Sequence, residues 1–291
     1  MIWSLPPVRP VARKEERVSK ELLAFIHVAK TGGQTVEQML RSSYGPAHAE
    51  AVEWAPRPAA DPRAVDYVVP KYTPDDLRRL QRLCPWLRSV GGHGIALWSN
   101  LQEVRPVRWL AFVREPLARG ASHFQYHVQT DRPDLAWDDW VDWPVHRNHQ
   151  LKMFSPTADA QDAIRRIEAQ EVFVGLTERF DESLLVFRRL LRPDLDPAYV
   201  RTNTARGNDL ARELLAGAGT RRQLEAMYGD ERPLYEWVAN EWYPRYRRAY
   251  GPTLAADLEE FRRHRQRVNR LNMALNRICH RLLIAPRAGR A

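Results

Sequence analysis

A loop near the start of the chain combines a lysine, a threonine and two glycines. It follows residues 22–28, an apolar run typical of a strand buried on both faces. Apolar residues at helical spacing come next, so a helix is expected to begin there. A helix N-terminus binds anions through its free N–H groups, and glycine lets an anion approach the backbone closely. The residues predicted to form this site are Lys30, Thr31, Gly32, Gly33, Gln34 and Thr35.

The order of residues separates this loop from the ATP-binding P-loop. The sequence contains no G-x-x-x-x-G-K-[ST] segment, and Lys30 precedes the glycines instead of following them. The alternative interpretation is an ordinary turn between a strand and a helix, with a solvent-exposed lysine.

Residues 108–113 and 171–175 are predicted to be further buried strands, and residues 86–90, which run into a glycine-rich turn, form a possible strand. Strands that alternate with amphipathic helices indicate an α/β fold with a parallel sheet covered on both faces. Ligands of such sheets bind beyond the C-terminal ends of the strands. Lys30, His93 and Arg114 each follow a predicted strand, so we expect them at one edge of the sheet.

Several other segments have helical patterns. Thr73 is a predicted N-cap for residues 73–83, with Pro74 at the first helical position. Residues 46–74 are rich in Pro, Ala and Asp, and little regular structure is expected there. Further helices are predicted at residues 117–128, after residue 175, and around residues 208–228, 234–249 and 254–283.

Residues 25–33, Phe-Ile-His-Val-Ala-Lys-Thr-Gly-Gly, resemble the 5′-phosphosulfate loop of carbohydrate sulfotransferases that use 3′-phosphoadenosine 5′-phosphosulfate (PAPS). The likeness is to the heparan sulfate 2-O/6-O sulfotransferases and their bacterial relatives. It covers roughly residues 22–191, is weak between the motifs and is absent from the last third of the chain. It implies a three-layer fold like that of P-loop nucleotide kinases, with a helical C-terminal portion. The activity implied is sulfuryl transfer to a hydroxyl of a carbohydrate or glycolipid, with Lys30 and residues 31–35 gripping the donor.

Residues 112–124 resemble the 3′-phosphate motif of the same family, in which an arginine ends a strand and a serine lies eight residues later. The resemblance implies that Arg114 and Ser122 bind the 3′-phosphate. A guanidinium fork and a hydroxyl in the following helix suit that role. Considered alone, Arg114 would be expected to form a salt bridge, and Ser122 would be an ordinary helix serine.

Transfer to an alcohol also needs a base, and histidine suits this role because its pKa lies near neutrality. His93 lies in a glycine-rich turn and resembles the Gly-His element of bacterial relatives, whose histidine matches the catalytic base of the heparan enzymes. The resemblance therefore implies that His93 is the general base. His27 is expected to be a hydrogen-bonded structural histidine, whereas His123 and His127 could face either the core or the cleft.

The acceptor side is less defined. Trp137, Trp140 and Trp143 could stack on sugar rings, but a short helix that buries Trp137 and Trp140 is the favoured interpretation. Residues 148–150 resemble a polar element of relatives and are expected to line the cleft. Arg206, in a polar loop that loosely matches a stretch near the nucleotide in relatives, is a further candidate donor contact.

The composition suits one large domain, since 44% of the 291 residues are hydrophobic. There is no apolar run of the ~20 residues that span a bilayer, and no signal-peptide pattern. Two cysteines, Cys84 and Cys279, do not suffice for a disulfide framework, which favours a reducing compartment. A cytoplasmic enzyme is expected.

The net charge of +9 is confined to one segment. Residues 261–291 contain nine arginines and no acidic residue, so residues 1–260 carry no net charge and a nucleic-acid partner is not expected. The favoured interpretation is a terminal helix with one face packed on the domain and a solvated basic face. Contact with an anionic membrane or with a partner helix are the alternatives. The apolar residues at helical spacing in this segment are Leu271, Leu275, Ile278 and Leu282.

These patterns divide the chain into an irregular arm (1–20), a sulfotransferase-like α/β domain (21–260) and a basic C-terminal helix with a tail (261–291). Three other functions compete. A glycosyltransferase is suggested by the D-x-D sequence at 194–196, although flanking prolines favour an ordinary turn. A small-molecule kinase would share the loop, and a basic module could bind polyanions. No H-E-x-x-H or C-x-x-C motif occurs, so no metal is expected.

Overall fold

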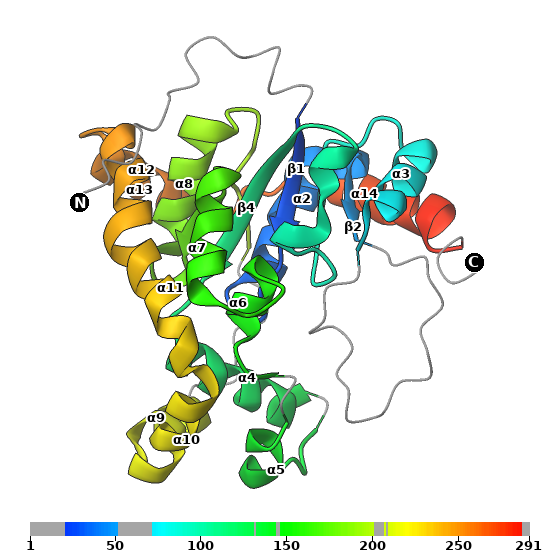
Figure 1. The fold of residues 1–291 in the computed structure, drawn as a ribbon. Helices are drawn as coiled ribbons and strands as arrows, with labels where there is room; N and C mark the ends of the chain where they lie inside the picture. Colours follow the sequence, from blue (N-terminus) through cyan, green and yellow to red (C-terminus); the bar gives the residue numbers. More distant parts are fainter. Residues whose placement is uncertain are drawn as a thin grey trace.

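Five parallel strands form the centre of the molecule (Figure 1). The computed structural model describes residues 21–51, 72–130, 132–143, 146–200, 207 and 209–286. The strand order is β2-β3-β1-β4-β5, which confirms the predicted α/β fold with a parallel sheet. The strands are β1 (Leu22–Ile26), β2 (His48–Glu50), β3 (Ser89–Gly92), β4 (Val107–Val113) and β5 (Phe173–Leu176).

The connections of the sheet diverge between β1 and β4. Strand β1 pairs with both, and Phe25 lies opposite Gly91 in β3 and Leu110 in β4. From β1 the chain crosses toward β2 at one edge, and from β4 it crosses toward β5 at the other. Adjacent strands whose connections leave in opposite directions open a crevice at their C-terminal ends. Lys30 and Arg114 follow these two strands, so both lie at this switch point.

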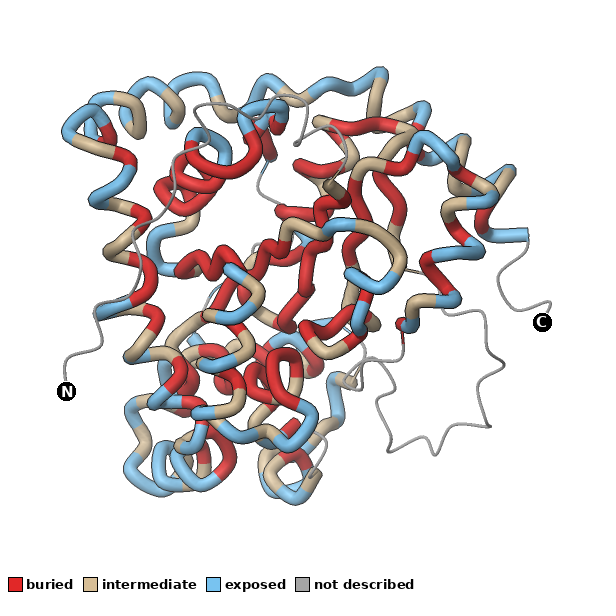
Figure 2. The backbone as a smooth tube through the Cα atoms, turned by 45° about the horizontal axis from the view of Figure 1, so that its top comes forward, coloured by how far each residue is buried: buried red, intermediate tan, exposed pale blue. Residues whose placement is uncertain are grey.

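Helices flank the sheet on either side (Figure 1). Strand β1 is buried along its whole length, which is why its sequence is a continuous apolar run. Figure 2 shows the buried residues concentrated in the middle of the molecule and the exposed residues around the outside. The main helices are α2 (Gly33–Tyr44), α3 (Pro74–Leu83), α4 (Pro116–Thr130), α5 (Trp137–Val141), α6 (His149–Phe154), α7 (Ala160–Ala169), α8 (Phe180–Leu191), α9 (Asp209–Ala216), α10 (Ala218–Tyr228), α11 (Arg232–Trp237), α12 (Tyr243–Tyr250), α13 (Leu254–His264) and α14 (Arg270–Cys279).

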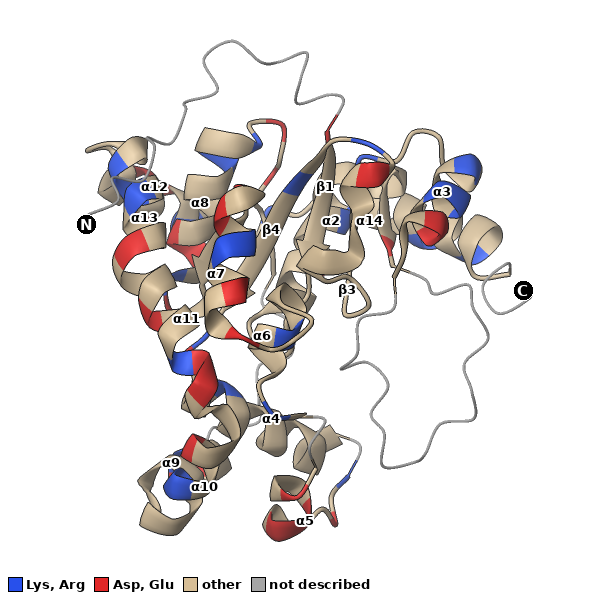
Figure 3. Ribbon diagram, in the orientation of Figure 1, with Lys and Arg blue, Asp and Glu red and all other residues tan. Residues whose placement is uncertain are grey.

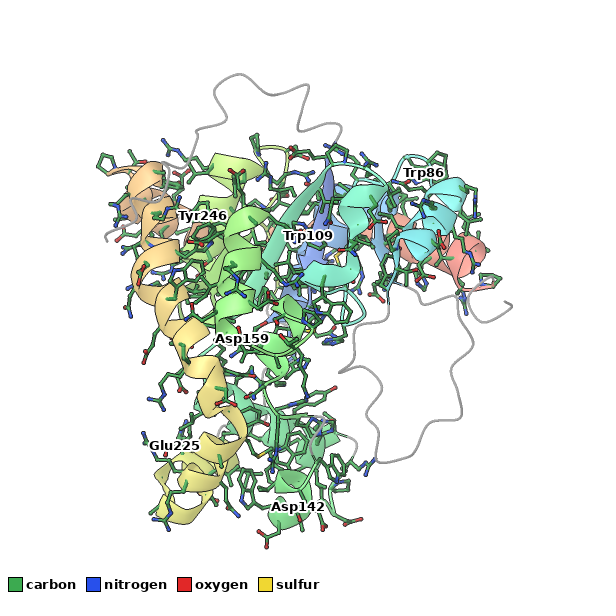
Figure 4. The ribbon with its side chains drawn as sticks, in the orientation of Figure 1. Trp86, Trp109, Asp142, Asp159, Glu225 and Tyr246 are labelled. Atoms are coloured by element: carbon green, nitrogen blue, oxygen red, sulfur yellow. The ribbon has the colours of Figure 1, made fainter. Side chains whose placement is uncertain are left out.

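A second, smaller core lies below the sheet in Figure 1, in a lobe made by α4, α5, α9 and α10. Trp140 is fully buried there and stacks on His146 with ring centroids 3.8 Å apart. Trp137 donates from Nε1 to the Gln223 side chain. The short helix that buries Trp140 is as predicted, and this tryptophan belongs to the core of the lobe. Figure 4 places Asp142 and Glu225 at the outer end of the lobe, far from Trp109 in the sheet.

The start of α3 matches its prediction in detail. The Thr73 hydroxyl accepts from the Asp76 amide, and the Asp76 carboxylate accepts from the Thr73 amide. This reciprocal capping box fixes the first turn, with Pro74 at the first helical position.

Strand β2 is a correction, because its three residues lie in a segment predicted to have little regular structure. Within the described residues it pairs with β3 alone, and it contains His48 and Glu50, so it lacks the apolar run that identified β1 and β4. Residues 52–71 of that segment lie outside the described residues.

The long helices predicted in the last third are interrupted. Gly217 separates α9 from α10, and a π-helical turn at Val238–Trp242 comes just before Pro244, which has no N–H for the helical ladder. The predicted helix at 254–283 is two helices, because the Asn269 side chain accepts from the Asn272 amide and caps a new one. Within the described residues, no helix combines the length and apolarity needed to cross a membrane.

Candidate active site

The loop after β1 has an unusual backbone. Lys30 has φ 66° and Gly32 has φ 89°, both in the left-handed region, and α2 begins at Gly33. Glycine adopts this conformation freely, but a lysine there is uncommon, and such residues cluster at functional sites. The Thr31 hydroxyl donates to the Val28 carbonyl and ties the turn together. Lys30 is therefore held in an unfavourable conformation by the structure around it.

The two glycines are also required by packing. A side chain at Gly32 would approach the Phe180 ring to 2.9 Å, and one at Gly33 would overlap the His27 ring. The Thr35 amide donates to the Gly32 carbonyl, so it is already used at the start of the helix. The amides of Gly32, Gly33 and Gln34 precede it at the helix N-terminus and are the ones best placed for an anion.

The Lys30 ammonium lies over an aromatic ring of α4. Nζ is 4.1 Å from the centroid of the Tyr126 ring. Burial, and next the positive charge of Arg114, lower the pKa of Lys30 to about 8. Lys30 is thus still charged at neutral pH but poorly compensated, so a bound anion would stabilise it.

Arg114 reaches from the end of β4 to this same loop. Its Nη1 donates to the Lys30 carbonyl at 3.3 Å. Its own amide donates to Gln150 Oε1, and its carbonyl accepts from Gln150 Nε2. Burial lowers the pKa of Arg114, although Glu178 and Glu115 partly oppose this. The arginine of the second motif is therefore brought to the loop of the first.

Ser122 lies in the second turn of α4 and is half-buried. It is four residues before Tyr126, and residues at i and i+4 share a helix face. Because the Tyr126 ring contacts Lys30, Ser122 lies on the face of α4 that is nearer the loop.

His93 is joined to the strand that precedes the loop. Its Nδ1 bonds to the His27 carbonyl at 2.8 Å, and the two imidazole rings stack with centroids 3.8 Å apart. A carbonyl accepts only, so Nδ1 carries the proton and Nε2 has the lone pair. Burial lowers the pKa of His93, and the bond to His27 and the charge of Glu37 oppose this. His93 is a neutral imidazole with the tautomer that a general base needs.

A network of buried polar side chains lies next to the stacked rings of His27 and His93. His27 is buried, and its Nδ1 is 3.8 Å from Glu37 Oε1. The other carboxylate oxygen of Glu37 is 3.0 Å from His48 Nε2, and His48 Nδ1 bonds to the Ser89 hydroxyl. This buried network links α2 to β2 and β3 beside the stacked histidines.

Two adjacent residues at the start of α6 support both motifs. His149 Nε2 accepts from the Ala29 amide at 3.1 Å, and burial lowers its pKa well below the usual value, so the ring is neutral. Gln150 holds the backbone of Arg114, and its Nε2 also donates to Glu231. The sequence predicted only that this polar element lines the cleft.

Glu231 in turn pairs with Arg119. Both side chains are fully buried, with Arg119 Nη2 3.3 Å from Glu231 Oε1. Arg119 therefore belongs to the support of the site. His123 and His127 are likewise buried, and they face the lobe core beside Trp140.

Thr177 was missed by the sequence reasoning. It follows β5, and its hydroxyl lies within bonding distance of the Thr31 and Val113 carbonyls, at 3.1 and 3.0 Å. It thus ties the end of β4 to the loop after β1. Its position just beyond a strand is the same signal that singled out Lys30, His93 and Arg114, and could have found it.

Two other candidates from the sequence are Arg206 and the D-x-D sequence at 194–196. Arg206 lies outside the described residues. Asp194, the first residue of the D-x-D sequence, accepts from Arg88, Arg192 and Tyr44. It therefore stabilises a turn, as the flanking prolines predicted. Among the described residues, no group of three or more His, Cys, Asp or Glu side chains is arranged to hold a metal ion.

No family model matches the sequence, and no curated protein matches it. The geometry of the site must therefore carry the functional argument. At the switch point of the sheet, two cationic side chains and a helix N-terminus lie together, with a neutral histidine anchored to the same strand. The two cations and the helix N-terminus can together bind a ligand that carries two anionic groups. The histidine can accept a proton beside that ligand.

A cavity of about 650 Å³ between α8 and α13 lies elsewhere, lined by residues such as Arg188, Asp257 and Arg265. Its lining includes Asp196 of the D-x-D sequence but none of Lys30, His93 or Arg114. The candidate active site is therefore identified by the charged and polar groups at the switch point, and not by the volume of a cavity.

Proposed function

We propose that this protein is a sulfotransferase that moves a sulfuryl group from PAPS to a hydroxyl of a carbohydrate or glycolipid. One observation carries the proposal: Arg114 of the second motif contacts the Lys30 carbonyl of the first. A donor with phosphate at two positions needs both elements at one site. ATP has no 3′-phosphate, so it would leave Arg114 and Ser122 without a phosphate to bind.

The proposed donor site divides between two elements. Lys30 and the amides of residues 32–34 bind the 5′-phosphosulfate, with residues 31 and 35 shaping the loop. Arg114 and Ser122 bind the 3′-phosphate. The strand order also favours the more specific fold assignment, a nucleotide-kinase-like three-layer fold, since the loop follows the central strand β1.

In the proposed reaction the acceptor oxygen attacks the sulfur while the bond from sulfur to the bridging phosphate oxygen breaks. His93 Nε2 takes the acceptor's proton, and its Nδ1–H remains bound to the His27 carbonyl. The leaving group is 3′-phosphoadenosine 5′-phosphate, whose new charge is stabilised by Lys30 and the loop amides. The products are a sulfate ester and this nucleotide, with no metal invoked.

Calorimetric titration of the full chain tests the donor class. We expect 3′-phosphoadenosine 5′-phosphate to bind at least about tenfold more tightly than ADP or UDP, a difference of about 1.4 kcal/mol. Arg114→Ala should remove this preference and leave ADP binding nearly unchanged. Equal affinity of the wild type and Arg114→Ala for 3′-phosphoadenosine 5′-phosphate contradicts the 3′-phosphate assignment, and tighter binding of ATP favours a kinase.

A further inference from the structure

The last helix docks on the domain through asparagines. Asn276 Nδ2 donates to the Gly45 and His48 carbonyls at 2.8 and 2.7 Å, and Asn272 Nδ2 donates to the Ser42 carbonyl at 2.9 Å. These bonds satisfy backbone carbonyls at the end of α2 and in the turn that leads to β2. The side of α14 that faces the protein therefore includes these two asparagines, together with Cys279, which packs against the core.

An apolar face formed by α14 and by the π-helical turn His280–Ile284 that continues it lies outward, which corrects the favoured interpretation of this segment. Four apolar side chains at helical spacing were expected to pack on the domain, but all are exposed. Periodicity identifies an apolar face, but it does not tell which face will meet donors that the domain needs. Their exposed fractions are 68% for Leu271, 41% for Leu275, 53% for Ile278 and 64% for Leu282.

Exposed arginines border this apolar stripe, which we define as Leu271, Leu275, Ile278 and Leu282. Three of the four stripe residues directly follow an exposed arginine, and one residue is about 100° around a helix. The arginines therefore form a row along one flank of the stripe. They are Arg270, Arg277 and Arg281.

The rest of the segment is equally one-sided in charge. Residues 261–291 contain no acidic side chain. Asp181 on α8 is 3.3 Å from Arg262 and 3.2 Å from Arg265, so those two are already paired. By contrast, Figure 3 shows charges of both signs interspersed along α7 and α11.

We infer that α14 docks the protein on an anionic membrane surface, with the apolar stripe in the interface and the arginines against lipid headgroups. An amphipathic helix with a basic flank lies in the plane of such an interface, and arginine stems extend along it while their charged ends reach the headgroups. A second copy of this chain fits worse as the occupant, because two acid-free basic segments would repel each other. Docking of this kind is independent of the donor chemistry proposed above.

The test uses the full chain and vesicles of phosphatidylcholine, either alone or mixed with phosphatidylglycerol. We expect the protein to sediment with the mixed vesicles only, and salt to release it. Replacing two stripe residues in the variant L271N/L275N should reduce the fraction bound about tenfold or more. Arg270→Gln with Arg277→Gln and Arg281→Gln should abolish the preference for the mixed vesicles.

Val200→Asn is the matched control, because Val200 is an exposed apolar residue outside α14. It should bind vesicles like the wild type, and all variants should keep the wild-type circular dichroism spectrum and Tm. Equal binding by L271N/L275N and the wild type would overturn the inference. So would a protein that ignores vesicles but forms a dimer that L271N/L275N dissociates. Binding of 3′-phosphoadenosine 5′-phosphate is measured separately. A protein that binds this nucleotide but not the vesicles contradicts the membrane inference alone and leaves the donor proposal standing.

Discussion

The edge of the sheet and the surface of α14 break the usual distribution of side chains in opposite ways. At the edge, the cations Lys30 and Arg114 are held partly out of water. On α14, Leu271 and Ile278 are left in water. Buried charge and exposed apolar surface are the two departures that carry information, because exposed polar and buried apolar groups are the rule. The buried charge costs stability, whereas the exposed apolar side chains gain none from folding. Each departure is expected where a ligand or a surface supplies the missing partner.

The largest effect is expected at Lys30. Lys30→Met keeps the length of the side chain and removes the charge that we propose faces the leaving phosphate. Turnover with PAPS should fall by about 10²–10³-fold, the usual loss for one electrostatic contact to a transition state. A rate assay with a radiolabelled donor measures this, and a variant with near-wild-type turnover would remove Lys30 from the site.

The same variant should be more stable than the wild type without ligand. The pKa of Lys30 is lowered to about 8 in the folded protein, so folding opposes its charge. This cost is fully present below pH 8 and disappears as pH rises from about 8 toward 10.5, where the unfolded lysine also loses its proton. We expect Tm to rise at pH 7, by about 2–4 °C per kcal/mol, and the gain to shrink above pH 8. A lower Tm at pH 7 would show that Lys30 already has an adequate partner.

The next effect is expected at His93. His93→Ala should lower kcat by about 10²-fold or more, the usual contribution of a positioned base. Since burial lowers the pKa of His93, the acidic limb of kcat/KM for the wild type should lie below pH 6.5. The pH profile from 5 to 9 measures it, and loss of that limb in His93→Gln supports the assignment. An unchanged limb in the variant assigns the base to another group.

A smaller effect is expected at Gln150. Gln150→Leu leaves the Arg114 amide and the buried Glu231 carboxylate without one bond each, which should cost about 1–3 kcal/mol of unfolding free energy. Because Gln150 positions Arg114, affinity for 3′-phosphoadenosine 5′-phosphate should fall while affinity for ADP changes little. Equal losses for both nucleotides would instead indicate general loosening of the edge.

The smallest effect is expected on the apolar stripe. Leu271→Ala should change the unfolding free energy by less than about 0.5 kcal/mol, since the side chain is exposed. Leu40→Ala on α2, where the leucine is fully buried, should cost about 2–5 kcal/mol. Urea titrations of the two variants compare them directly. A large loss for Leu271→Ala would mean that the stripe is part of the folded core.

The sequence predicted what short-range patterns encode. Buried strands have continuous apolar runs, so β1, β4 and β5 were found, and the Thr73 cap was found because its partner lies three residues away. The supports of the site were not found, because His149 is 120 residues from Ala29 and Gln150 is 36 from Arg114. Such contacts depend on the path of the chain between them, which no local pattern records. For the same reason, the sequence did not show which face of α14 packs on the domain.

Helix α6 gives the site a property that no single contact gives. Its first two residues, His149 and Gln150, bond to the backbone at Ala29 and at Arg114, so one short helix contacts both motifs. A small rotation of α6 would move both ends of a bound nucleotide together. Substitutions at His149 and Gln150 should accordingly show strong coupling in a double-mutant cycle, and a design that alters the donor would have to begin at α6.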